Sequence, residues 1–346
     1  MKKQQTSRRL RPFLLWLAVF YTAWALVVVL GAHAETLLRH WGIAAAMAAG
    51  SYVAGSTPMG GGTVGFPILV LLFDQPATLG RDFSFAIQAI GMTSASIFIL
   101  CTRQPLEWPM LRAAMIGSAV GTPLGIFLVA PLVPELTVKV VFAVLWASFG
   151  LLHLHRFREI TSNEGITPTQ PRFDAITGLL IGFLGGLTVA SITGAGVDMM
   201  LYVALVLLCH ADLKIAIPTS VIIMAFTSVL GILVKLAFGD VAPGVFEHWL
   251  AAAPVVALGA PLGALIVSRM GRKPTLFVVS LLCLFQFAWT MSDEWHRLGL
   301  TGLLLAGLGL LLFGMTFQWM HRLGMRLARR SRRTENPPVV ASGRHL

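Results

Sequence analysis

Two clusters of glycine and hydroxyl-bearing residues interrupt otherwise apolar stretches, and they hold the residues best suited to chemistry. The first cluster, 55–63, contains three consecutive glycines shortly after a proline, and the second, 191–196, contains two glycines. A continuous helix is disfavoured through glycines with a proline beside them. We therefore expect a broken helix within each of the apolar stretches 42–73 and 174–208.

Broken helices of this kind can bind an anion inside a membrane. A helix that begins near Thr63 or Val197 offers free backbone N–H groups and a favourable partial charge at its N-terminus. Glycines let an oxyanion approach the backbone closely, and hydroxyls add neutral donors. The candidate binding residues are Ser56, Thr57, Gly60, Gly61, Gly62 and Thr63 in the first cluster and Ser191, Thr193, Gly194 and Gly196 in the second. The alternative is that these small residues serve only close helix packing.

Polar residues near the clusters extend the candidate site. The pairs Thr93–Ser94 and Thr227–Ser228 line the site from the side, or else their hydroxyls bond back to their own helix. Asp198 lies in an apolar run, where an ionisable group is costly and usually faces a cavity or a partner. A neutral Asp198 can carry a proton beside an anion; alternatively, it caps the helix that begins there. Lys235, near the end of its run, is expected to extend to the membrane interface.

The elements that position these residues are membrane helices. Of the 346 residues, 56% are hydrophobic and 12% charged, whereas soluble proteins have about 25% charged residues. Several runs exceed the roughly 20 residues that span a bilayer as a helix. The fold class is an all-α polytopic membrane protein, which excludes soluble enzymes and nucleic-acid binding. The ten apolar runs are 13–31, 42–73, 83–101, 109–131, 138–153, 174–208, 213–238, 249–268, 275–290 and 299–319.

The net charge of +11 is confined to the two ends of the chain. Residues 1–12 carry five basic groups, 321–346 carry a net +6, and the segment between them is neutral. This pattern predicts that both termini are cytoplasmic, provided that residues 1–34 are retained. Residues 32–35 have the form of a signal-peptidase site, but the run before them is longer than a signal h-region. We expect a retained signal-anchor helix, with cleavage after Ala34 as the alternative.

The sequence contains an internal duplication. One constant offset along the chain superposes Gly62 on Gly196 and Thr93–Ser94 on Thr227–Ser228 without a gap. The small-residue spacing at Gly117, Gly121, Gly259 and Gly263 indicates helix packing. The expected organisation is a basic N-terminus with a first helix (1–41), repeat 1 (42–154), a polar linker (155–173), repeat 2 (174–291), a last helix (292–320) and a basic tail (321–346).

The path of the two broken stretches decides the topology. If each crosses the membrane once, the repeats are parallel; if each folds back as a re-entrant hairpin, the repeats are inverted. The distribution of Lys and Arg favours inverted repeats. Interrupted hydrophobic segments at matching positions of two repeats are the sequence pointer to the central site of a transporter.

At these residues the sequence resembles the sulfite exporter TauE/SafE family, also called the toluene-sulfonate uptake permease family. The likeness covers 42–291 and rests on 60–67, Thr93–Ser94, 193–196, 211–216, Thr219–Ser220 and Thr227–Ser228. It implies a multi-pass transporter of sulfite, sulfonates or related anions in the prokaryotic cytoplasmic (inner) membrane. In the second repeat Ala195 breaks the glycine triplet and Leu201 takes the place of a proline, so the first cluster is expected to be closer to the family pattern.

The functional prediction is a secondary transporter of a small anion, coupled to the proton gradient. A passive anion channel is the main alternative, because broken helices also build selectivity filters. A membrane-embedded enzyme is disfavoured, since the chain has no HExxH, GxSxG or Walker motif and no catalytic residue is assigned. Cys101, Cys209 and Cys283 lack ligand spacing, so no metal site or cofactor is expected. The expected partners are the anion and the lipid bilayer, and homo-oligomer formation is left open.

Overall fold

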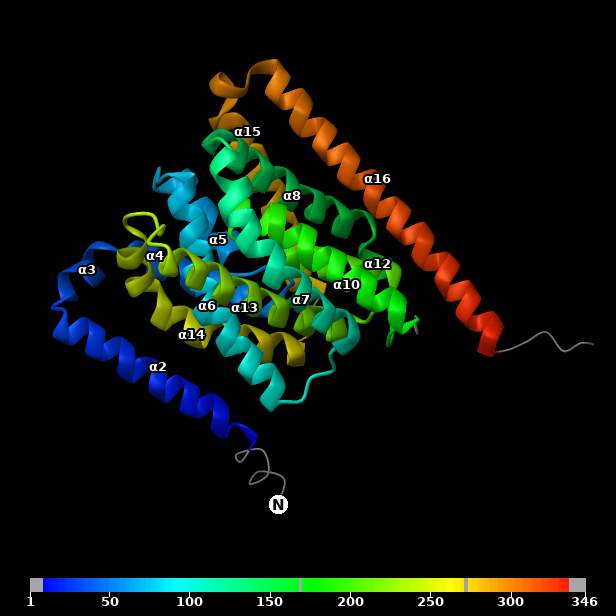
Figure 1. The fold of residues 1–346 in the computed structure, drawn as a ribbon, viewed down its shortest axis with the longest axis horizontal. Helices are drawn as coiled ribbons and strands as arrows, with labels where there is room; N and C mark the ends of the chain where they lie inside the picture. Colours follow the sequence, from blue (N-terminus) through cyan, green and yellow to red (C-terminus); the bar gives the residue numbers. More distant parts are fainter. Residues whose placement is uncertain (1–8, 168–169, 271–272, 336–346) are drawn as a thin grey trace, which may run out of the picture.

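The computed structural model describes residues 9–167, 170–270 and 273–335, and these residues form helices without any strand (Figure 1). This confirms the all-α fold class. Nine helices in the described part are long and apolar enough to cross a membrane. They span Arg11–Leu30, Ala77–Cys101, Trp108–Leu132, Glu135–His155, Pro171–Thr193, Leu213–Ala237, Val245–Ile266, Lys273–Asp293 and Trp295–Arg329.

The elements follow each other in a similar order in the two halves of the chain. The first half contains α4 (Trp41–Ser56), α5 (Gly62–Pro67), η1 (Ile68–Leu72), α6 (Ala77–Cys101), α7 (Trp108–Leu124), η2 (Gly125–Val129), η3 (Ala130–Leu132) and α8 (Glu135–His155). After α9 (Phe157–Ile160), the second half contains α10 (Pro171–Gly185), η4 (Gly186–Ala190), α11 (Ser191–Thr193), α12 (Val197–Leu208), α13 (Leu213–Ala237), α14 (Val245–Met270) and α15 (Lys273–Asp293).

The first broken stretch folds back on itself as a hairpin, here called hairpin 1 (residues 41–73). Its return arm, α5 and η1, runs along α4. Gly50 of α4 packs on Val64, and Gly42, at the start of α4, packs on the ring of Phe73, just past the return arm. A continuous helix from 42 to 73 would separate Gly42 from Phe73 by about 46 Å. The run 42–73 is therefore a hairpin and not one continuous helix, as the re-entrant alternative requires.

The second broken stretch folds back in the same way and is called hairpin 2 (residues 170–209). The backbone N–H of Thr167, before its first arm, donates to the carbonyl of Cys209, after its second arm, at 2.8 Å. Closer to the tip, Gly185 of α10 packs on Val197 and Met200 of α12. Each hairpin therefore begins and ends at the same end of the bundle, as the re-entrant alternative requires.

The two hairpins enter the bundle from opposite ends, because three crossing segments, the helices starting at Ala77, Trp108 and Glu135, separate them along the chain. Packing between the halves is reciprocal: α7 packs along α10, α14 packs along α4, and the pairs α6–α13 and α8–α15 lie together. This is the pattern that inverted repeats would produce, and the duplication itself remains a prediction.

Glycines make the contacts between the halves close, as their spacing predicted. Gly117 and Gly121 of α7 lie against the carbonyls of Leu179 and Phe183 in α10. On the opposite pair, Gly259 and Gly263 of α14 lie against Ser51 and the carbonyl of Tyr52 in α4. The packing interpretation of these glycines is confirmed.

Two further helices flank the bundle on opposite sides in Figure 1, namely α2 (Arg11–Leu30) and α16 (Trp295–Glu335). A short helix, α3 (Ala34–Arg39), follows α2. The indole N–H of Trp24 in α2 donates to the carbonyl of Leu250 in α14 at 2.9 Å, and α16 kinks at Gly299. Residues 1–8 and 336–346, at the far ends of the two basic tails, lie outside the described residues.

Candidate functional site

The tips of the two hairpins are residues 60–62 in hairpin 1 and 194–196 in hairpin 2. Both tips contact one side chain, Gln88, at the middle of α6. Gln88 is fully buried. In hairpin 1, a Cβ added to Gly62 would lie 2.0 Å from Nε2 of Gln88, and one added to Gly60 would lie 2.6 Å from Oε1. In hairpin 2, the carbonyl of Gly194 accepts a long hydrogen bond of 3.4 Å from Nε2 of Gln88. Only glycine permits hairpin 1 to approach so closely.

Side chains from α6 and α13 complete the walls around Gln88. Ser84 of α6 touches both tips. Its Cβ would lie 2.7 Å from a Cβ added to Gly62 and 2.8 Å from a Cβ added to Gly194. From α13, the hydroxyl of Ser228 donates to Oε1 of Gln88 at 3.5 Å. Sequence reasoning predicted Ser228 and the glycines but missed Gln88 and Ser84. The only signal for Gln88 was a single amide within an apolar run.

The other glycines of the two clusters have different roles. Gly194 and Gly196 have φ values of +79° and +122°, a conformation that L side chains rarely adopt, so they form the turn of hairpin 2. Gly61 faces away from Gln88, toward Met47 of α4. Thr63 borders an apolar groove between hairpin 1 and α15, which Cys283 also lines. Of the first glycine triplet, Gly60 and Gly62 therefore face Gln88, and Gly61 does not.

Most of the predicted hydroxyl donors bond back to their own segment in this conformation. These intrasegment hydrogen bonds run from Ser56 and Thr57 to Val53, from Ser191 to Leu187, from Thr193 to Val189 and from Thr227 to Ile223, each to a carbonyl oxygen. Ser94 donates instead to the carbonyl of Ala257 in α14 at 2.6 Å, and its neighbour Thr93 is half-buried. The donating hydrogen of each of these hydroxyls is therefore occupied. Among the predicted hydroxyls, Ser228 is the one that donates to Gln88.

Asp198 caps the start of α12. Its Oδ1 atom accepts the backbone N–H of Gly196 at 2.9 Å. Its Oδ2 atom is buried and has no hydrogen-bond partner among the described residues. The capping interpretation is thus observed, while one carboxylate oxygen stays available for a proton or another partner.

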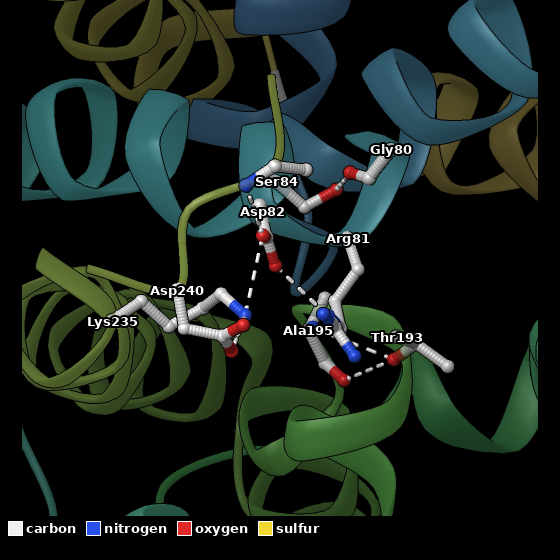
Figure 2. A network of polar contacts seen from close by, with 9 residues as sticks. Gly80, Arg81, Asp82, Ser84, Thr193, Ala195, Lys235 and Asp240 are labelled. Carbon is white, nitrogen blue, oxygen red and sulfur yellow. Dashed lines mark hydrogen bonds and ion pairs between the residues drawn. The ribbon is translucent and has the colours of Figure 1, made fainter. Parts of the chain in front are cut away.

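A buried ion network adjoins the tip of hairpin 2 (Figure 2). Asp82 of α6 receives Nε of Arg81 at 2.9 Å and Nζ of Lys235, from α13, at 3.2 Å. Lys235 also pairs with Asp240 at 2.7 Å. A Cβ on Gly194, in the tip of hairpin 2, would lie 2.3 Å from the backbone carbonyl of Arg81. The network therefore joins α6, α13 and the loop after α13 next to the candidate site.

This network bears on the expectation for Lys235 and adds a charged residue that sequence reasoning missed. Lys235 is buried and paired instead of exposed: its side chain is 1% exposed, and its ammonium group pairs with buried Asp82 and with exposed Asp240. Asp82, which is 1% exposed, is a further acidic side chain buried in the helical bundle besides Asp198. Sequence reasoning missed Asp82 because it lies just before the apolar run that begins at 83.

Comparison with known proteins assigns the chain to a family. The model of a family described as sulfite exporter TauE/SafE matches residues 42–291, which are 250 of the 346 residues. Comparisons with curated proteins and with solved structures return no match. The matched segment begins with hairpin 1 and includes both hairpins and the ion network. With nine helices in the described part able to cross a membrane, the chain is a multi-pass membrane transporter that belongs to the sulfite exporter TauE/SafE family.

Proposed function

We propose that this protein is a secondary transporter that carries sulfite, an organosulfonate or a related small anion across the cytoplasmic membrane, with both termini in the cytoplasm. The observation that carries the proposal is the meeting of both hairpin tips on Gln88, halfway along α6. The family description supplies the class of anion.

The anion would bind between the two tips. The return arm of hairpin 1 begins at Gly62, and α12 begins at Val197, so both half-helices start at the tips. The first N–H groups of a helix lack acceptors within the helix, and the helix dipole favours an anion there. The amide of Gln88 and the hydroxyl of Ser228 add neutral donors, which bind an oxyanion without holding it too tightly to release.

Binding requires the tips to move apart. In this conformation the contacts of Gly60 and Gly62 with Gln88 leave no room even for a methyl group. Because hairpin 1 enters from one end of the bundle and hairpin 2 from the other, the displacement of one tip would open the site toward one side only. This is the requirement of alternating access, and it favours a carrier over a passive channel.

We assign coupling to the proton gradient to Asp198. Its Oδ2 atom is buried without a hydrogen-bond partner in the described part, at the tip of hairpin 2. Protonation would neutralise the carboxylate and remove its repulsion of an anion at the adjacent helix N-terminus. An anion and a proton would then travel together.

The proposal is tested with the purified protein in proteoliposomes. Labelled sulfite, sulfate, a sulfonate and a carboxylate are each offered with and without an imposed pH gradient, and protein-free liposomes provide the background. Saturable uptake of sulfite or a sulfonate that the gradient increases would support the proposal. Flux that does not saturate and ignores the gradient would indicate the channel, and uptake of the carboxylate alone would show that the anion class is wrong.

A further inference from the structure

A separate group of side chains gathers at the end of the bundle where hairpin 2 begins and ends. Glu159 of α9, His210 just after hairpin 2 and His321 of α16 each place one ligand atom within 4.8 Å of the others. The three positions are far apart in the sequence, so no short motif announces them. We propose that Glu159, His210 and His321 form a binding site for a divalent transition-metal ion, with Zn²⁺ as the ion of best fit.

The distances suit a metal with little rearrangement. Nδ1 of His321 lies 3.2 Å from Oε1 of Glu159, and metal–ligand bonds of about 2.0–2.1 Å in a tetrahedron place neighbouring ligand atoms about 3.3 Å apart. This pair is therefore already at the separation that a shared metal requires. The rings of His210 and His321 have centroids 6.0 Å apart, so rotation of His210 about its side-chain bonds completes the set.

The ligand chemistry points to a borderline metal. Two imidazole nitrogens with one carboxylate oxygen suit Zn²⁺, Co²⁺ or Ni²⁺, whereas Mg²⁺ and Ca²⁺ prefer oxygen alone. All three residues are half-buried, so the site is partly shielded and still reachable from solvent. Three protein ligands leave one position of a tetrahedral ion for water.

Neighbouring groups hold the three ligands in place. Arg156 pairs with Oε2 of Glu159 at 2.8 Å, which leaves Oε1 directed at His321, as a supporting residue around a metal site does. The helix α16 packs closely against the end of α12 and against His210: a Cβ on Gly324 would lie 2.1 Å from the carbonyl of Leu207 and 3.0 Å from the ring of His210. A bound ion would tie α9, the base of hairpin 2 and α16 together.

The test uses full-length protein in detergent, with its purification tag removed and its metals stripped by a chelator. Zn²⁺ alone is titrated by calorimetry, and binding of one equivalent is expected. His321→Ala and Glu159→Gln should each weaken the affinity at least tenfold. His296→Ala is the matched control, because His296 is exposed near the other end of the same helix, and it should bind as the unsubstituted protein does.

Two further measurements separate the site from misfolding and from binding elsewhere. Without metal, the thermal unfolding midpoint of His321→Ala should match that of the unsubstituted protein. Zn²⁺ should raise the midpoint of the unsubstituted protein and of His296→Ala, but not that of His321→Ala. Co²⁺ should give the visible absorption of a tetrahedral nitrogen and oxygen site, and His321→Ala should abolish it. Absence of saturable binding, or full affinity in both His321→Ala and Glu159→Gln, would overturn the proposal.

Discussion

Replacement of Gln88 by methionine separates a role in anion binding from a role in packing. Methionine has nearly the length and volume of glutamine but lacks its donors. The hydrogen bonds that Gln88 makes to Gly194 and Ser228 measure 3.4 and 3.5 Å, at or beyond the long end of the normal range. Each is expected to contribute about 0.5 kcal/mol. The folded protein should therefore lose only about 1 kcal/mol of stability.

The expected loss of transport is much larger. A hydrogen bond to a charged group contributes about 1.5–3 kcal/mol, and 1.4 kcal/mol corresponds to a tenfold change in affinity. If the Gln88 amide donates to the anion, Gln88→Met should raise the half-saturating concentration roughly 10- to 150-fold. The difference between the small effect on stability and the large effect on transport identifies a ligand of the anion.

The assay compares initial uptake rates over a range of anion concentrations in proteoliposomes with thermal unfolding in detergent. Gln318→Met is the matched control, because Gln318 is exposed on α16, and it should leave both measurements unchanged. Uptake within twofold of the unsubstituted protein, by a folded Gln88→Met variant, would refute the assignment of Gln88 to the site. A fall in the unfolding midpoint that accounts for the whole transport loss would assign Gln88 to packing.

Three further substitutions test neighbouring parts of the site. Gly62→Ala should cost about 1–3 kcal/mol of stability by overpacking the tips, and it should slow uptake. Gly307→Ala is the control and should do neither, because a Cβ there meets nothing within 4 Å. Equal unfolding midpoints for the two variants would contradict the close approach of hairpin 1 to Gln88. Asp198→Asn should make uptake insensitive to the pH gradient, and an unchanged pH dependence would remove Asp198 from coupling. Lys235→Met should destabilise the protein by about 3 kcal/mol, because it leaves Asp82 buried with fewer partners. Adding Asp82→Asn should reverse part of the fall in the unfolding midpoint. If the midpoint does not recover at all, the pairing of Lys235 with Asp82 is contradicted.

Features that depend on the bilayer itself were predictable from the sequence. Long apolar runs can be satisfied in a membrane only as helices, since every backbone group must find a partner within the segment. The glycine clusters at 55–63 and 191–196 also announced where those helices break. The spacing of Gly117 and Gly121 indicated a close helix contact, which the structure places against α10. Each of these features follows from local composition.

Features that depend on which helix faces meet were not predictable. Nothing in the apolar run around Gln88 indicates which of its faces meets the hairpin tips. The direction of a hydroxyl group is equally hidden, because a Thr such as Thr227 can always donate to a carbonyl in the preceding turn. Asp82 and Lys235 are far apart in sequence, and only the packing of α6 against α13 brings them together. A lysine at the end of an apolar run looks interfacial until its partner is known.

The central polar groups are not duplicated between the halves. The offset that superposes Gly62 on Gly196 also pairs Gln88 with Ile222 and Asp198 with Val64. Each half therefore contributes a different polar group near its hairpin. Under the proposed function, the amide of the first half would donate to the anion and the carboxylate of the second half would carry the proton. A site with two identical halves would hold two amides or two acids, and it would lack one of these functions.

The ion network is asymmetric in the same way, and this bears on how the protein opens. The same offset between the halves pairs Asp82 with Ala216 and Lys235 with Cys101. One end of the α6–α13 pair is thus closed by buried ion pairs, while the corresponding positions at the other end carry small side chains without charge. Separating a buried ion pair leaves uncompensated charges in a medium of low polarity, whereas separating small apolar groups costs only their contact. The end that carries Ala216 and Cys101 should therefore open more readily, and the end that carries Asp82 and Lys235 should open only when another charge, such as the transported anion, compensates the separated ions.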